Sequence, residues 1–143
     1  MKDTAGKTLK NGTDYTVKYS SGRKNPGQYT VTVTFKGSYS GKKNLTFTIA
    51  PKAPTLKVTA GSKKATLSWN KQTGATGYVV YMATTQNGKY TKIATIKNNG
   101  TVSMTKTGLT TGKTYYFKVA AYKTVSGKNI YSSYSSAKYV KIK

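Results

Sequence analysis

Apolar and polar residues alternate along three segments of the first fifty residues. In Tyr15–Tyr19, Tyr29–Phe35 and Leu45–Ile49, every second residue is aliphatic or aromatic, and threonine or lysine stands between. A period of two is that of a β-strand with one buried side. The segments 21–27 and 37–43 that separate them are rich in glycine, serine and lysine, as turns are. The pattern predicts three strands connected as an antiparallel meander.

The same alternation recurs after residue 55 in shorter segments separated by turn signals. Asn-Gly pairs at 87–88 and 99–100 lie between them, and this pair is a strong hairpin signal. Seven short strands at this spacing predict a β-sandwich. The predicted strands are Leu56–Val58, Ala65–Trp69, Tyr78–Met82, Tyr90–Ile96, Val102–Thr107, Tyr115–Ala121 and Val140–Ile142.

Two prolines, Pro51 and Pro54, divide the chain. Proline cannot pair inside a central strand and stiffens an extended connection, so we expect a first unit over residues 1–50, a linker over 51–54 and a second unit over 55–143. Three strands in a unit this small bury too little surface for independent stability. We therefore expect the apolar side of the first unit to be covered by upstream strands, by the second unit or by another copy.

Charge is strongly one-sided in this chain. It has 25 lysine and arginine residues against two acidic residues, with no histidine or cysteine and a net charge of +23. Arg23 is the only arginine, and the lysines are spread from Lys2 to Lys143. Specific nucleic-acid recognition relies on arginine, so only non-specific contact with nucleic acid is expected. A solvated surface, attraction to an anionic polymer and engineered surface charge all fit this composition.

The composition also removes most catalytic chemistry. Proton transfer at neutral pH uses histidine or paired carboxylates, and the only carboxylates are Asp3 and Asp14. Zinc has no cysteine or histidine to bind, and calcium needs more than two carboxylates. Ser-x-x-Lys occurs at 21–24 and 40–43, but both copies lie in predicted turns rather than at a helix start. We expect no enzyme activity, no cofactor and no metal site, and no apolar stretch long enough for membrane insertion.

Three features stand at separated points of the second unit. They are Trp69, the run Tyr78-Val79-Val80-Tyr81, and the run Leu109-Thr110-Thr111-Gly112-Lys113-Thr114-Tyr115. Together they resemble a fibronectin type III domain over about residues 54–143. The resemblance implies a core made by Trp69, Tyr78, Leu109 and Tyr115, with Trp69 at its centre. It also implies a tyrosine corner, in which the Tyr115 hydroxyl bonds back to the backbone. Thr111 departs from the family, which often has proline there.

The first unit carries a second resemblance. Its runs Gly12-Thr13-Asp14-Tyr15-Thr16-Val17 and Gly27-Gln28-Tyr29-Thr30-Val31-Thr32-Val33 are similar to the later strands of a bacterial Ig-like repeat. Such repeats usually carry more strands upstream. Some surface Ig-like domains crosslink lysine to asparagine with a buried acid, but Asp14 is expected to support a turn instead. The expected fold class is thus all-β, with two tandem Ig-like β-sandwich units, the first lacking strands and the second a seven-stranded fibronectin type III sandwich.

The pairing of these two modules is similar to repeat regions of large secreted or wall-attached proteins of Gram-positive bacteria. That resemblance implies a non-catalytic spacer or adhesion module, extracellular or in the cell wall, whose partners are the neighbouring domains of a larger protein. The alternative is an electrostatic binding module for anionic polymers such as teichoic acid, acidic polysaccharide or, non-specifically, nucleic acid.

A tyrosine- and lysine-rich face is predicted on the second unit. If Tyr78, Val80, Tyr115 and Phe117 point into the core, the residues between them lie on the outer side of the sheet. The resulting candidate binding face consists of Tyr81, Tyr116, Lys118, Tyr122, Tyr139 and Lys141. Such side chains can stack on sugars or bases and hold anionic groups. They can equally stabilise an exposed sheet through cross-strand pairs without binding anything.

Overall fold

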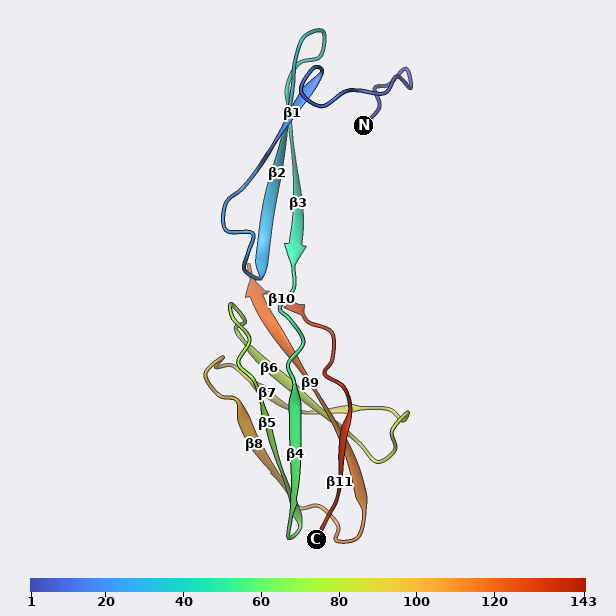
Figure 1. Cartoon of the computed structure of the whole chain (residues 1–143), viewed down its shortest axis with the longest axis vertical. Coiled ribbons are helices and arrows are strands. Elements are labelled where there is room, and N and C mark those ends of the chain that lie inside the picture. The colour runs from blue at the N-terminus through green and yellow to red at the C-terminus, as the bar shows by residue number, and fades with distance from the viewer. The chain divides into compact units, whose positions relative to one another are not determined.

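The computed structural model describes all residues 1–143, and its regular structure consists of β-strands (Figure 1). The all-β fold predicted from the alternation is therefore confirmed. The chain divides into two compact units, unit 1 over Met1–Ile49 and unit 2 over Ala50–Lys143. None of the chain forms a helix long and apolar enough to cross a membrane.

Unit 1 is built on a three-stranded antiparallel sheet. Its strands are β1 (Tyr15–Tyr19), β2 (Gly27–Phe35) and β3 (Lys42–Ile49), paired in the order β1-β2-β3. This is the predicted meander. Because paired residues share a side of the sheet, Val17 of β1 and Val33 of β2 lie opposite each other on the apolar side.

The apolar side of this sheet is covered only in part by unit 1 itself. Val33 and Leu9, which belongs to the segment before β1, are buried at 3% and 5% exposure. Tyr19 and Leu45, at 51% and 44%, remain exposed. A single sheet has no second layer to bury its other apolar residues, which is why their exposure varies along the strands.

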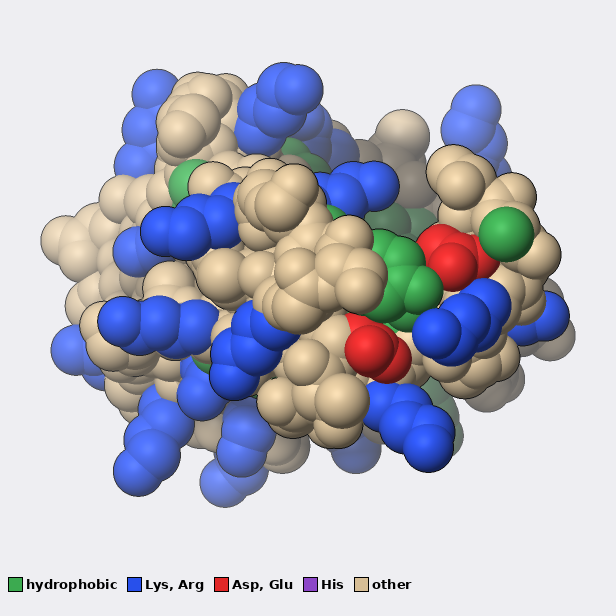
Figure 2. Space-filling view, turned by 90° about the horizontal axis from the view of Figure 1, so that it is seen from above, with side chains coloured by type: hydrophobic (Ala, Val, Ile, Leu, Met, Phe, Trp, Pro, Cys, Tyr) green, Lys and Arg blue, Asp and Glu red, His purple; other side chains and the backbone are tan.

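Basic side chains are spread over the molecule rather than gathered in one patch, as Figure 2 shows for one side. Both acidic residues belong to unit 1, so lysine is the only charged residue type in unit 2. Asp3 Oδ1 accepts hydrogen bonds from the N–H groups of Ala5 and Lys7, at 3.0 and 2.8 Å. Asp14 Oδ2 accepts one from the Lys10 N–H at 2.8 Å. The two carboxylates thus stabilise turns in the segment before and at the start of β1.

Unit 2 contains two antiparallel sheets. The smaller has the order β4-β5-β8, and its strands are Leu56–Gly61, Lys64–Trp69 and Ser103–Thr107. The larger has the order β10-β9-β6-β7, with β11 also paired to β9. Its strands are β6 (Gly77–Ala83), β7 (Thr91–Ile96), β9 (Thr114–Val125), β10 (Lys128–Tyr131) and β11 (Lys138–Lys141).

Unit 2 has eight strands rather than the predicted seven, because β10 forms between β9 and the last predicted strand, which is β11. β10 pairs with β9 at Tyr131–Tyr122, and β11 pairs with β9 at Lys138–Phe117, so the two strands pair with separate parts of β9. The β9–β10 turn has positive φ at both Ser126 and Gly127, which is the geometry of a type I′ hairpin. The sequence prediction missed β10 because it is short and its alternation stops at a run of serines.

Serine side chains hold the segment 132–137 to β9 where regular pairing is interrupted. The N–H groups of Ser132 and Ser135 donate to the carbonyls of Ala121 and Val119, both at 2.8 Å. In return, the Ala121 and Val119 N–H groups donate to the Ser132 and Ser135 hydroxyls, at 2.9 and 3.0 Å. The hydroxyls thus take the place of strand carbonyls, and no N–H of β9 in this region is left without an acceptor.

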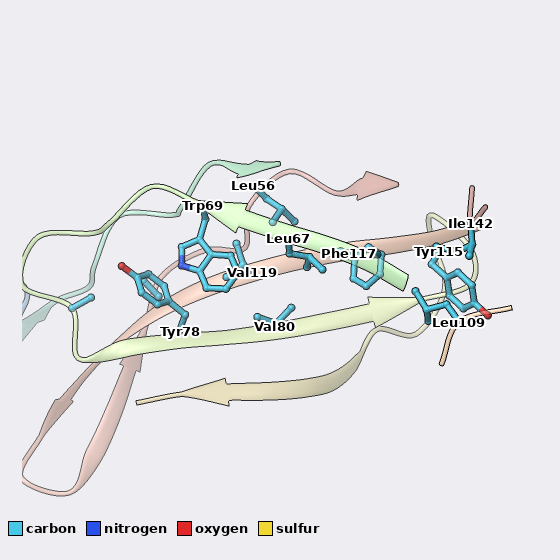
Figure 3. Packing of buried hydrophobic residues seen from close by; sticks show 13 residues of the cluster. Leu56, Leu67, Trp69, Tyr78, Val80, Leu109, Tyr115, Phe117, Val119 and Ile142 are labelled. Atoms are coloured by element: carbon cyan, nitrogen blue, oxygen red, sulfur yellow. The ribbon is translucent and has the colours of Figure 1, made fainter. Parts of the chain in front are cut away.

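The hydrophobic core of unit 2 lies between the two sheets (Figure 3). The residues labelled there are Leu56, Leu67, Trp69, Tyr78, Val80, Leu109, Tyr115, Phe117, Val119 and Ile142. The Trp69 and Tyr78 rings lie 5.4 Å apart at one end. The Tyr78 hydroxyl accepts from the Gln72 N–H at 2.9 Å and donates to Asn99 Oδ1 at 2.6 Å. These bonds satisfy the polar end of a tyrosine that is otherwise fully buried.

Leu109 and Tyr115 lie toward the other end of this core, beside Ile142 (Figure 3). Their exposed fractions are 4% and 8%. The Tyr115 hydroxyl accepts a hydrogen bond from the Thr110 N–H at 3.2 Å. This contact joins β9 to the loop that precedes it, across the turn at Gly112, whose φ is +80°.

Candidate binding surface

The outer side of the larger sheet in unit 2 carries four cross-strand pairs between β6 and β9, one of which is Ala83 opposite Tyr116. Tyr81 lies opposite Lys118, Val79 opposite Ala120, and Gly77 opposite Tyr122. Val79 and Ala120 are exposed by only 2% and 1%, although they point away from the core between the sheets. Larger side chains on this side of the sheet therefore cover them.

Tyrosine rings provide this cover, in three pairs. The ring centroids are 5.1 Å apart for Tyr81 and Tyr134, 5.5 Å for Tyr116 and Tyr139, and 5.9 Å for Tyr122 and Tyr131. In each pair one ring stands on β6 or β9, and its partner comes from β10, β11 or the segment between them. The partner rings are about half exposed or more, whereas the sheet rings are partly or fully buried. Each pair thus has a covered ring and a solvent-facing ring.

Lys118 lies among these rings. Its Nζ is 4.2 Å from the centroid of the Tyr90 ring and 6.0 Å from that of Tyr134. Tyr90 precedes β7, and its hydroxyl donates to the Gln86 carbonyl at 3.0 Å. An ammonium group over an aromatic ring is held by the negative face of that ring. We call the six paired tyrosines, Tyr90 and Lys118 the tyrosine face.

The structure brings most of the predicted face together. Tyr81, Tyr116 and Lys118 lie partly exposed on it, and Tyr139 is 68% exposed on β11. Lys141 is exposed on β11 opposite Thr114, at the end of the strand, and belongs to none of the ring contacts.

Tyr122 lies on the outer side of the sheet, as predicted, but its place in an exposed binding face was wrong, because its side chain is only 4% exposed. Its ring lies across Gly77, where a Cβ atom would meet the Tyr122 hydroxyl at 2.9 Å and the Ile96 carbonyl oxygen more closely still. The hydroxyl donates to that Ile96 carbonyl at 3.5 Å, and Tyr131 covers the ring from outside. Glycine at position 77 is therefore what allows Tyr122 to lie flat against the sheet.

Three members of the tyrosine face were not predicted: Tyr90, Tyr131 and Tyr134. Tyr90 was predicted to begin the strand Tyr90–Ile96 but was not assigned to this face, and it precedes β7 in the structure. Tyr134 lies outside the strands and Tyr131 ends β10, so alternation did not place them. The available signal was the repeat Tyr-Ser-Ser-Tyr-Ser-Ser at residues 131–136. Its serines recur every three residues, which is the spacing of the two hydroxyls that bond to β9.

A pocket of about 410 Å³ opens on this face. It is lined by Tyr81, Ala120, Tyr131, Ser132, Ser133 and Tyr134, and we call it the tyrosine pocket. Burial raises the pKa of the Tyr81 phenol above its ordinary value, and the neighbouring Tyr134 and Tyr131 hydroxyls raise it further. Tyr81 is thus a neutral hydrogen-bond donor at physiological pH. No group of three or more histidine, cysteine, aspartate or glutamate side chains suited to a metal ion occurs in the chain.

The comparison with known families decides what unit 2 is. Residues 50–138 match the family model of the fibronectin type III domain. The chain belongs to this family. The predicted resemblance is thereby confirmed. The additional strand β10 and the tyrosine face are features of this particular fibronectin type III domain.

One curated relative is the amylopullulanase of Thermoanaerobacterium saccharolyticum, which is 37% identical over 73 residues. The match covers 50% of this chain but only 6% of that enzyme. The chain is therefore similar to a small segment of the relative, and the rest of the enzyme has no counterpart in the aligned region.

Solved structures show the same fold for the fibronectin type III domain. The crystal structure of an Fn3-like protein from Clostridium thermocellum is 28% identical, with a TM-score of 0.51, and the match covers 66% of this chain and 93% of that one. A segment of two fibronectin type III domains from chicken tenascin gives a TM-score of 0.62 at 16% identity, covering 80% and 64%. At that identity the tenascin likeness concerns the fold alone.

Proposed function

We propose that the chain is a non-catalytic spacer or adhesion module of a secreted or cell-surface bacterial protein with several domains. The observation that carries the proposal is the match to a small segment of a bacterial amylopullulanase. The match covers only 6% of that enzyme, which supports a role for the matched segment as one module among several. By the same analogy we place this chain outside the cell, next to further domains.

The side chains of unit 2 support a non-catalytic role. The fibronectin type III domain has no histidine, cysteine, aspartate or glutamate, which leaves it without an ordinary general acid or base at neutral pH. Its buried tyrosines are committed to hydrogen bonds inside the fold, as for Tyr78 with Gln72 and Asn99.

The non-catalytic proposal is tested by incubating the purified chain with pullulan and soluble starch and measuring new reducing ends. We expect none above the buffer blank. Release of reducing ends that follows the protein through purification would overturn the proposal. Sedimentation with insoluble starch and with purified bacterial walls, measured in parallel, separates a pure spacer, which stays in solution, from an adhesion module, which does not.

A second candidate function is electrostatic binding of anionic polymers. It is favoured by one observation: every charged side chain of unit 2 is a lysine, so no carboxylate within this unit neutralises any of them. The summed field of such a domain attracts polyanions over a distance set by the ionic strength.

Salt dependence tests this second candidate. We expect the affinity of the whole chain for teichoic acid or polygalacturonate to fall steeply between about 50 and about 300 mM salt, because binding releases condensed counterions. Isothermal titration at several salt concentrations gives the slope. An affinity that stays constant over this range would contradict the electrostatic mechanism, and absence of binding at low salt would leave the spacer function alone.

A further inference from the structure

We propose that the tyrosine pocket binds one sugar unit of an acidic polysaccharide, with Lys118 holding the carboxylate of that unit. The inference rests on the anionic-polymer binding proposed above and gives it a defined site. Without such a site, the lysines of unit 2 would attract any polyanion equally and no single side chain would matter. With it, a few residues of the tyrosine face carry most of the affinity.

The pocket is pre-formed by hydrogen bonds within unit 2. The segment 132–137 leaves regular strand pairing, yet both Ser132 and Ser135 bond to β9 through main chain and hydroxyl. Tyr134, placed between these two anchors, packs against Tyr81 and forms one wall. Because these walls are held before any ligand arrives, little ordering entropy is lost on binding.

The geometry of the two rings favours a sugar over a nucleic-acid base. The Tyr81 and Tyr134 rings meet at 84°, so they form a corner rather than two parallel plates. A planar base cannot be sandwiched in such a corner. A pyranose ring has an apolar side and a rim of hydroxyl groups, so it can lie on one ring while its hydroxyls reach Ser133 and the tyrosine hydroxyls. The volume of about 410 Å³ lies in the range of small-molecule sites.

The charge around Tyr81 favours an acidic sugar. Its partner on β9 is Lys118, and its partner on β7 is Lys92, so lysines flank the ring on both sides along the sheet. Lys118 Nζ already lies 6.0 Å from the Tyr134 ring centroid, at the side of the pocket. Neither lysine has a side-chain carboxylate as partner within unit 2, because this unit contains no aspartate or glutamate. A uronate unit supplies both an apolar ring side and the missing negative charge.

The test uses the whole chain and hexagalacturonate as the probe, at about 50 mM salt, with the affinity measured by isothermal titration. Tyr134→Ala should weaken binding about tenfold, which is the effect of losing one stacked ring. Tyr19→Ala is the matched control, because Tyr19 is also about half exposed but lies in unit 1. It should change the affinity less than about twofold, since it leaves the tyrosine pocket intact. The fluorescence of Trp69, the only tryptophan, checks that unit 2 is folded in each variant, and far-UV circular dichroism checks unit 1 in Tyr19→Ala.

A second pair of variants separates the site from the overall charge. Lys118→Gln and Lys57→Gln remove the same charge, but Lys57 lies exposed on β4, in the other sheet of unit 2. The site predicts a loss of about fivefold or more for Lys118→Gln and less than about twofold for Lys57→Gln. Equal losses for the two, with no effect of Tyr134→Ala, would overturn the pocket and leave electrostatic binding standing.

Two further probes test the class of ligand. Maltohexaose has the same number of sugar units without carboxylates, and we expect at least about tenfold weaker binding. Equal affinity would overturn the role given to Lys118. Single-stranded oligothymidylate that binds more tightly than hexagalacturonate, and loses affinity in Tyr134→Ala, would replace the sugar by nucleic acid. No binding of hexagalacturonate at low salt, while teichoic acid is still bound, would overturn the pocket and leave the electrostatic function standing. Absence of binding of both would refute the two together.

Discussion

Trp69 combines a large buried ring with an unsatisfied polar atom. The side chain is 5% exposed and packs against Tyr78. Its Nε1 is buried without a hydrogen-bond partner. A buried N–H that lacks an acceptor costs about 1–3 kcal/mol. This cost offsets part of the stability that unit 2 gains from burying the Trp69 ring.

Two substitutions at this position should therefore differ strongly. Trp69→Ala should lower the free energy of unfolding of unit 2 by about 3–5 kcal/mol, because it leaves a large cavity. Trp69→Phe should lower it by only about 1–2 kcal/mol, because it keeps most of the apolar ring and removes the unpaired N–H. Urea unfolding followed by circular dichroism measures both. Equal losses would contradict this expectation, because they would mean that the phenyl ring kept in Trp69→Phe fills none of the cavity.

Ser135 is a second residue whose role can be isolated. Its hydroxyl accepts from the N–H of Val119, a residue with no exposed surface. Ser135→Ala should lower the free energy of unfolding by about 1–3 kcal/mol, because that buried N–H loses its acceptor. Ser136→Ala is the control, since this neighbouring side chain is exposed and only its main-chain carbonyl is used. Hydrogen exchange at the Val119 amide should speed up in the first variant and not in the second.

At the level of strands, alternation predicted most strands of the three sheets well. It missed β10 and the segment 132–137 at the edge of the larger sheet of unit 2. Period-two runs such as Tyr29–Phe35 mark a strand wherever one side is buried, and β2 forms there. The segment 132–137 escaped prediction because its hydrogen bonds go through serine side chains, which leave no alternation of polarity. The sequence predicted five of the eight residues of the tyrosine face, from β6, β9 and β11, whereas the positions of Tyr131 and Tyr134 depend on where that irregular segment is anchored.

The β9–β10 hairpin offers a test of the element that sequence analysis missed. Nothing lies within 4 Å of a Cβ placed on Gly127, so Gly127→Ala is opposed only by its φ of +77°. It should cost about 1–2 kcal/mol. Ser126→Asn should instead stabilise unit 2 by about 0.5–1 kcal/mol, because asparagine followed by glycine is the preferred type I′ pair. Thermal melts of both variants give the sign, and a neutral Gly127→Ala would contradict the turn geometry.

In the molecule as a whole, the two units differ in how their stability depends on pH. Hydrogen bonds from the N–H of Lys7, and then from the Tyr39 hydroxyl and the Ala5 N–H, hold the pKa of Asp3 in unit 1 below its ordinary value, against a smaller opposing effect of burial. A lowered pKa in the folded state means that the contribution of Asp3 to stability is present above the ordinary carboxyl pKa. It is lost as the pH falls through the lowered one. Unit 2 has no side chain of this kind.

Unit 2 should therefore resist acid. Apart from the chain terminus, none of its groups changes charge between about pH 3 and pH 8, so both its net charge and its free energy of unfolding stay constant there. The urea midpoint of Trp69 fluorescence, which reports on unit 2 alone, should be the same at both ends of this range at fixed ionic strength. A midpoint that falls at low pH would contradict the argument.

Because lysine is the only charged side chain in unit 2, a change of polysaccharide binding at acidic pH would come from the polysaccharide and not from the protein. A uronate polymer gains protons near pH 3–4 while the lysines keep their charge, so the complex should dissociate on acidification although the protein itself does not change. Acid would thus act as a release signal that is sensed by the polysaccharide and not by the domain that holds it.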